Sequence, residues 1–171
     1  MKKIAIYFVM FFSVLSSHTA FSQVTNIAVA DLDRALRISN YSLKQYEVLR
    51  SDKNYQQLID KIKSVRTEIE LMKKDGQTKS LTWSEEQKTE HIEKGQTKVA
   101  EINNLANQEA AIRNRLDASI QQELAPKVEL IVNKIIEEKS IGVLFKSQAV
   151  HFYTPEFDIT EEVVKRLNGS E

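Results

Sequence analysis

The chain has 171 residues, of which 42% are apolar and 28% are charged, and it contains four glycines, two prolines and no cysteine. The absence of cysteine excludes a disulfide framework, a thiol nucleophile and a cysteine-based zinc site. Lysine plus arginine and aspartate plus glutamate both number 24, so the charge gives no indication of a nucleic acid partner. So few turn-forming residues disfavour a many-stranded sandwich or barrel and favour long helices.

The first 22 residues have the pattern of a cleaved export signal. Two lysines precede an apolar run at residues 4–15, which is too short to span a bilayer comfortably. Ala20 and Ser22 place small side chains three residues and one residue before the predicted cleavage site. The mature chain would begin at Gln23, carry 22 basic and 24 acidic residues, and be exported in soluble form. This fits a bacterial periplasm; a retained membrane anchor is the alternative.

A short strand and a short helix are predicted next. Residues 24–30 are β-branched and apolar, as in a strand. Asp31 predicts the N-cap of a helix that runs to Ile38, and Ser39 with Asn40 predicts a break.

Long helices are predicted between Ser42 and Glu138. Five apolar residues are spaced alternately four and three apart: Leu58, Ile62, Val65, Ile69 and Met72. This heptad spacing, with polar residues between, predicts a narrow coiled-coil seam that needs one partner helix or very few. Gly76 predicts the end of this helix.

The returning helix is predicted to begin after Leu81, where Thr82 with Glu85, or Ser84 with Gln87, would form a capping box.

Two residues are expected to weaken this helix. Gly95 lowers its helix propensity, and Pro126 is predicted to interrupt and kink it.

Because the connection near residues 76–82 is short, the two helices must run antiparallel. The hairpin would project roughly 55 Å from the rest of the chain.

The last part of the chain predicts more strands and a final helix. Residues 141–145 and 150–153 would form a strand hairpin, and with residues 24–30 they would make a three-stranded sheet. The final helix is predicted to have its N-cap at Thr160 and to stop at Asn168.

The predicted fold is therefore mainly α with a small β body. A helical hairpin at residues 42–125 is inserted into an oligomerisation body formed by residues 23–41 and 126–171. Such a small body needs support, which oligomerisation through the sheet would supply. The strand residues predicted to form this oligomer core are Ile27, Val29, Val143, Phe145, Val150 and Phe152.

Three segments resemble the Skp/OmpH-like periplasmic chaperones. NIAVADLDRAL at residues 26–36 resembles the first strand and the helix start of that family. LAPKVELIVNKIIEEKSIGVLF at residues 124–145 resembles its returning helix and second strand, and FDITEEVVKRLN at residues 157–168 resembles its C-terminal helix. Their order and spacing cover essentially the whole mature chain.

The resemblance implies a homotrimer whose strands form a central body and whose three helical arms enclose a cavity. It also implies ATP-independent holding of unfolded outer-membrane β-barrel proteins in the periplasm. The well-known members are strongly basic, whereas this mature chain has a net charge near −2. We therefore expect no strong long-range attraction to acidic clients, lipopolysaccharide or membrane surfaces.

The sequence predicts no catalytic, metal or cofactor site. His91 is flanked by acidic residues on a helix and is expected to be a solvated surface residue, and His151 alternates with Phe152 in a predicted strand. The four glycines form no phosphate-binding loop, so no use of ATP is indicated. An enzyme is accordingly the third-ranked class.

The predicted arm tip carries apolar residues that would contact clients, namely Met72, Leu81 and Trp83. Packing across the hairpin turn is the simpler role for Leu81 and Trp83. A structural coiled-coil scaffold of the envelope, which binds a folded partner, uses the same heptads and is the alternative to the holdase function.

Overall fold

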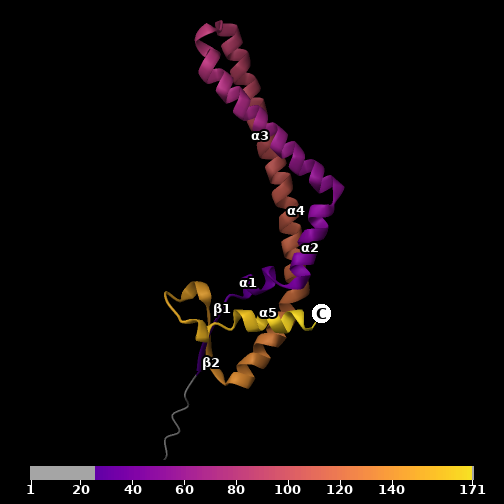
Figure 1. Cartoon of the computed structure of the whole chain (residues 1–171), viewed down its shortest axis with the longest axis vertical. Coiled ribbons are helices and arrows are strands. Elements are labelled where there is room, and N and C mark those ends of the chain that lie inside the picture. Colours follow the sequence, from indigo (N-terminus) through magenta and orange to yellow (C-terminus); the bar gives the residue numbers. More distant parts are fainter. Residues whose placement is uncertain (1–25, 171) are drawn as a thin grey trace, which may run out of the picture.

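The computed structural model describes residues 26–170, which form a small body and one long projecting arm (Figure 1). The predicted export signal, its cleavage site and residues 24–25 of the first predicted strand lie outside the described residues. The helices and strands, in chain order, are β1 (Asn26–Ala30), α1 (Leu32–Arg37), α2 (Asn40–Ser51), α3 (Lys53–Lys79), α4 (Glu85–Lys139), β2 (Ile141–Lys146) and α5 (Thr160–Asn168).

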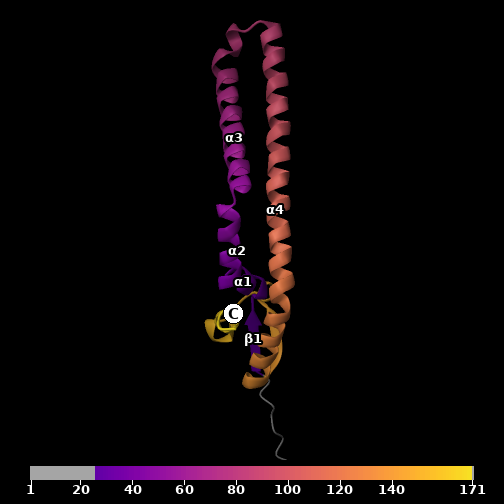
Figure 2. The same ribbon diagram turned by 90° about the vertical axis from the view of Figure 1, so that its right-hand side faces the viewer.

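The arm is an antiparallel helical hairpin, as the sequence predicts. One leg consists of α2 and α3, and the other is α4, whose 55 residues make it about 80 Å long. Figure 2 shows the two legs side by side along the arm. The legs are joined by three side-chain pairs, Tyr55–Glu109, Lys61–Glu101 and Glu68–Lys98. In each pair the mean of the two residue numbers lies between 81 and 83, close to the turn at the arm tip. The two legs therefore keep one register from the base to the tip.

The contact between the two legs is narrow. In the distal half of the arm the fully buried apolar side chains are Val65 and Leu105, which are 2% and 8% exposed. The other residues of the predicted seam, Leu58, Ile62, Ile69 and Met72, are half-buried. The arm therefore has a single thin layer of apolar contact in place of a globular core.

The ends of the arm helices differ in part from the prediction. Gly76 does not end α3, which continues to Lys79; a Cβ atom at Gly76 would lie 3.2 Å from His91 Nε2, so glycine allows the legs to approach. The capping box of α4 is formed by Ser84 and Gln87, whereas the hydroxyl of Thr82 donates to the Lys79 carbonyl.

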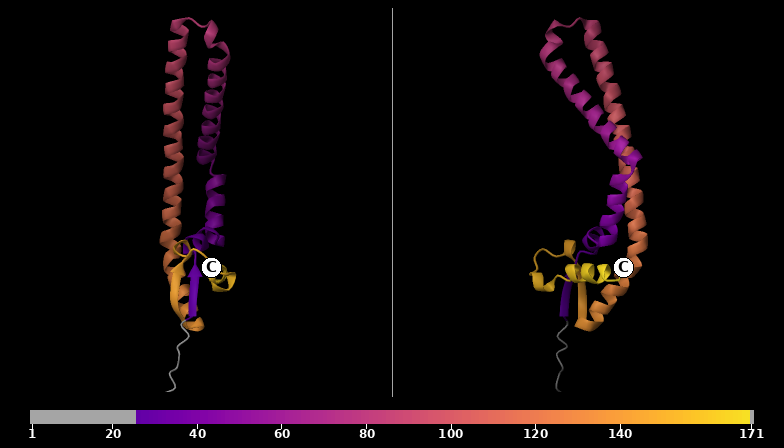
Figure 3. Two further views of the ribbon diagram at one scale, coloured as in Figure 1. Left: turned by 90° about the vertical axis from the view of Figure 1, so that its left-hand side faces the viewer. Right: turned by 45° about the vertical axis from the view of Figure 1, so that its right-hand side comes forward.

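Pro126 does not interrupt α4, contrary to the prediction. The helix continues from Glu85 to Lys139, and Figure 3 shows that it curves as it passes along the body. Leu124 and Val128, one turn apart around the proline, are 0% and 4% exposed and lie in the body core. Packing on both sides of Pro126 compensates for the missing backbone hydrogen bond.

The sheet has two parallel strands, not the three that the sequence predicts. β1 pairs with β2, with Ile27 opposite Val143 and Val29 opposite Phe145. Parallel strands need a long crossover, which here is the entire arm. Residues 150–153 form no strand because Ser147–Ala149 make a 3₁₀ turn, closed by the Val150 amide on the Ser147 carbonyl, that directs the chain away from β2.

The core of the body lies between the sheet, α4 and α5. Ala28 and Ala30 face it from β1, and Val163 and Leu167 face it from α5. Contrary to the prediction, Thr160 is not the N-cap of α5; Ile159 holds that position, and the Thr160 amide donates to the Asp158 carboxylate at 2.8 Å. The Thr160 hydroxyl instead accepts the Asp31 amide at 2.9 Å and joins α5 to the end of β1.

Two buried serines connect the body to the arm. Ser39 and Ser42 are both 0% exposed; the Ser39 hydroxyl donates to the Leu36 carbonyl at 2.9 Å and accepts the Ser42 amide at 3.2 Å as the N-cap of α2. Ser39→Ala leaves this buried amide unpaired, so we expect the free energy of unfolding to fall by about 1–2 kcal/mol. Chemical denaturation measures this free energy of unfolding. Ser51→Ala, at an exposed serine of the same helix, should change it by less than about 0.5 kcal/mol, and equal effects would contradict the prediction.

Candidate functional site

The outer face of the sheet is apolar and partly open. Ile27, Val143 and Phe145 are 49%, 38% and 43% exposed, while Val29 between them is covered. The register places these four predicted core residues side by side, and the opposite face, with Ala28 and Ala30, packs into the body. An uncovered apolar sheet face beside a small body is typical of an interaction surface.

The remaining two predicted core residues lie in the loop after β2. Val150 is half-buried and Phe152 is 79% exposed. The Tyr153 hydroxyl donates to the Asp158 carboxylate at 3.3 Å, which fixes the end of this loop to the start of α5. Phe157, which sequence reasoning did not select, is also 41% exposed in the same region, two residues after Pro155.

The arm tip separates the residues that the sequence groups together. Leu81 is 98% exposed in the 3₁₀ turn between the legs, whereas Trp83 is half-buried and packs on His91 with 4.5 Å between ring centroids. Met72 is half-buried in α3. His91 is therefore a packing residue of the tip, not the solvated residue that the sequence predicts. Leu81 is the most exposed of the large apolar side chains near the tip.

Charged pairs line the arm between its tip and its middle. Lys98 of α4 donates to Glu68 of α3 at 2.7 Å and to Glu101 at 3.0 Å. These bonds raise the pKa of Lys98, chiefly through Glu68, and lower the pKa of both carboxylates. At the tip, Lys79 lies 2.9 Å from Asp75 and lowers its pKa in the same way. All these groups are solvated, so the pairs add little to stability. The bond from Lys98 to Glu68 joins the two legs, whereas the other two pairs lie within one helix.

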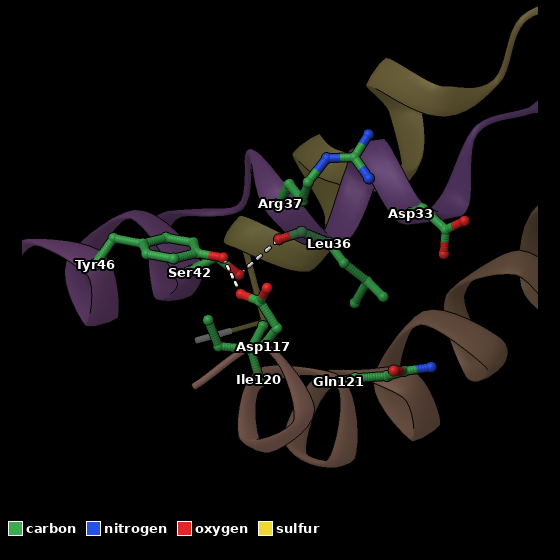
Figure 4. Close-up of a pocket in the computed structure, with 8 residues that line it drawn as sticks. All are labelled: Asp33, Leu36, Arg37, Ser42, Tyr46, Asp117, Ile120 and Gln121. Atoms are coloured by element: carbon green, nitrogen blue, oxygen red, sulfur yellow. Dashed lines mark hydrogen bonds between the residues drawn. The ribbon is translucent and has the colours of Figure 1, made fainter. Parts of the chain in front are cut away.

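A small pocket of about 180 Å³ lies where the arm leaves the body (Figure 4). Tyr46 and Asp117 meet through a hydrogen bond at one end of it, and the Ser42 hydroxyl donates to the Leu36 carbonyl at 2.6 Å. The bond to Asp117 is the main cause that raises the pKa of the Tyr46 hydroxyl. Tyr46, Asp117 and Ser42 are therefore already paired, and their bonds tie α2 to α4 and to α1.

Ion pairs hold the C-terminal end of α4 against α5, and they predict that the stability of the protein depends on pH. Arg166 donates to Glu138 and Glu162, each at 2.6 Å, and Lys139 lies 2.7 Å from Glu162. Arg166 is the main cause that lowers the pKa of Glu138, and Lys139 is the main cause for Glu162.

Because the folded-state pKa values are lowered, this stabilisation is complete above the ordinary glutamate pKa, about 4.3, and is lost as the pH falls through the folded values. We expect the melting temperature to fall between pH 6 and pH 3. Arg166→Gln should reduce that fall, whereas Arg115→Gln, an exposed arginine of α4, should not. An identical fall in all three proteins, measured by thermal unfolding, would contradict the prediction.

Among residues 26–170, no group of three or more histidine, aspartate or glutamate side chains is arranged to hold a metal ion. No helix of this part of the chain combines the length and the apolar character needed to cross a bilayer.

The chain is similar to a protein family, to a bacterial relative and to a solved structure. Residues 26–167 match the family model described as outer membrane protein (OmpH-like). An uncharacterized protein of Aquifex aeolicus (strain VF5) is 26% identical over 160 residues, which cover 92% of this chain and 95% of that protein. The crystal structure of an OmpH-like protein from Caulobacter crescentus CB15, a candidate outer membrane chaperone, is 18% identical, with 86% of each chain covered and a TM-score of 0.47. Since the family model spans most of the chain, the protein belongs to the OmpH-like family.

Proposed function

We propose that the protein is an ATP-independent holdase chaperone of the periplasm. In this proposal a homotrimer holds unfolded outer-membrane β-barrel proteins between its arms and prevents their aggregation. Membership of the OmpH-like family supports the chaperone role. The predicted export signal supports the location, and the protein would act without a cofactor and without catalysing a reaction.

The exposed apolar side chains of the arm are the observation that carries the proposal. Besides Leu81, five large apolar residues of the arm are about half-exposed: Leu43, Val48, Leu71, Ile92 and Val99. An unfolded chain without a fixed shape can be held by many weak apolar contacts, and such contacts release it without an energy source. The thin seam between the legs supports the same proposal, because a helix pair with few buried contacts opens locally at low cost.

The outer face of the sheet supports the proposed trimer. A two-stranded sheet is marginal by itself, and the exposed Ile27, Val143 and Phe145 would be covered if three copies packed around a common axis. Phe152 and Phe157 would extend this contact beyond the strands. Burying this face would supply the support that a small body lacks.

Light scattering tests the proposed function directly. A denatured outer-membrane barrel protein is diluted into buffer that contains the mature protein and no ATP. We expect aggregation to be suppressed near three subunits per client. Leu81→Ser should raise the ratio required, whereas Ser80→Ala in the same turn should not. Unchanged aggregation with the unmodified protein would overturn the holdase proposal and favour the envelope scaffold.

A further inference from the structure

The leg that leaves the body is broken at one residue. Asp52 ends α2 and begins α3 with an extended backbone (φ −68°, ψ 125°), and its carboxylate caps α3 by accepting the Tyr55 amide at 2.8 Å. α4 passes opposite this break as one continuous helix. Figure 1 shows that α2 and α3 meet at an angle, so the legs cannot pack evenly there.

A cavity of about 480 Å³ lies at this break, which we name the elbow cavity. Its walls are two tyrosines, two aliphatic residues and three arginines, namely Tyr46, Tyr55, Leu49, Ile59, Arg37, Arg50 and Arg113. The volume lies within the range of small-ligand sites, which is about 300–1,000 Å³. It is large enough for one or two side chains.

The two tyrosine rings are held in place from α4. Tyr46 donates its hydroxyl to Asp117, and Tyr55 donates to Glu109 at 2.9 Å. Burial and the bond to Glu109 raise the pKa of Tyr55. The rings are therefore fixed walls of the cavity, and the two carboxylates are occupied by the tyrosine hydroxyls.

The three arginines of this cavity differ in how far they are already paired. Arg113 Nε lies 3.8 Å from Glu109, a weak contact. For Arg37 and Arg50 the described part of the chain shows no side-chain hydrogen bond or ion pair. Arg37 also borders the small pocket at the arm base, whose other charged lining residues are Asp33 and Asp117. Guanidinium groups beside an apolar floor match a carboxylate that is attached to an apolar group, because arginine binds carboxylates with two parallel hydrogen bonds.

We propose that the elbow cavity is a carboxylate-binding subsite for unfolded polypeptide, which takes an acidic side chain next to an aromatic one. This inference rests on the proposed function and names a feature of the client. A single carboxylate fits better than a phosphate-rich ligand, because two carboxylates limit the positive potential: Glu109 lies 3.8 Å from Arg113, and Asp117 lines the small pocket together with Arg37.

A peptide-binding measurement on the full mature protein tests the subsite. The probe is a fluorescent eight-residue peptide of Gly and Ser that carries one Asp-Phe pair, compared by anisotropy with the same peptide carrying Asn-Phe. We expect the Asp-Phe peptide to bind about tenfold more tightly, since charge-assisted hydrogen bonds are the stronger class. Arg50→Gln should reduce this preference to near unity.

Lys44→Gln is the matched control. Lys44 lies on the same helix but borders a separate hollow with Glu47 and Val48, so the preference should persist. Equal binding of the two peptides by the unmodified protein, or an unchanged preference in Arg50→Gln, would overturn the subsite.

Two further measurements, vesicle binding and client aggregation, distinguish the subsite from a lipid site and from the holdase function. Vesicles of phosphatidylglycerol that bind through Arg50, with no peptide preference, would assign the cavity to lipid and overturn the proposal. Suppressed aggregation without a peptide preference would reject the subsite alone. A preference that Arg50→Gln removes, without suppressed aggregation, would support the subsite and reject the holdase function.

Discussion

Val143→Asp should convert the proposed trimer into monomers. Val143 is 38% exposed on the outer sheet face, beside Ile27 and Phe145. In a single subunit the new carboxylate stays in contact with water, so the body should remain folded. In a trimer it would be buried against two symmetry-related copies without a partner, a cost of several kcal/mol at each subunit. We expect sedimentation to give the mass of one subunit at micromolar concentration.

Val48→Asp provides a control with the same chemical change. Val48 is 60% exposed on α2 in the arm, away from the sheet, and this variant should sediment as the unmodified protein does. Circular dichroism should show the same helix content in both variants. A Val143→Asp protein that keeps the mass of the oligomer would reject the sheet face as the interface.

The elements that could be predicted from the sequence are those set by nearby residues. Spacings of four and three from Leu58 to Met72 predict the seam between the legs, and Val65 is its buried centre. The capping box at Ser84 is likewise a local pattern. The helical hairpin follows from such patterns, because each depends on a few adjacent side chains. The pairing of β1 with β2 does not, because the whole arm separates these parallel strands along the chain.

The elements that were predicted wrongly depend on distant parts of the chain. Gly76 lies inside α3 because His91, on the other leg, packs against it. Pro126 lies inside α4 because the body holds the helix on both sides of the proline. Residues 150–153 are an exception, because the cause is local. They have the composition of a strand, but the 3₁₀ turn just before them directs the chain elsewhere.

The elbow cavity was not predicted either. Asp52 is a good N-cap residue, and this was the one local signal that the first leg contains two helices. The position of Arg37, Arg50 and Arg113 around one hollow depends on the register of the legs, which sequence spacing alone does not define.

Leu124→Ala should strongly destabilise the protein. Leu124 is 0% exposed in α4, among core residues from β1, α1 and α5. Replacing a buried leucine by alanine costs about 2–5 kcal/mol, against a total of about 5–15 kcal/mol for a typical domain. The upper part of that range applies here, because Leu124 also holds α4 to the body just before Pro126. The melting temperature should fall by about 10 °C.

Leu130→Ala is the matched control, since Leu130 lies on the same helix and is 65% exposed. The same substitution there removes no core contact, so the free energy of unfolding should change by less than about 0.5 kcal/mol. Urea denaturation measured on both variants at one protein concentration decides the comparison. A loss at Leu124 no larger than the loss at Leu130 would mean that the helix is held across Pro126 by contacts other than the body core. A large loss at both positions would instead indicate that Leu130 is covered in the oligomer, which would place a second subunit against the outer side of α4.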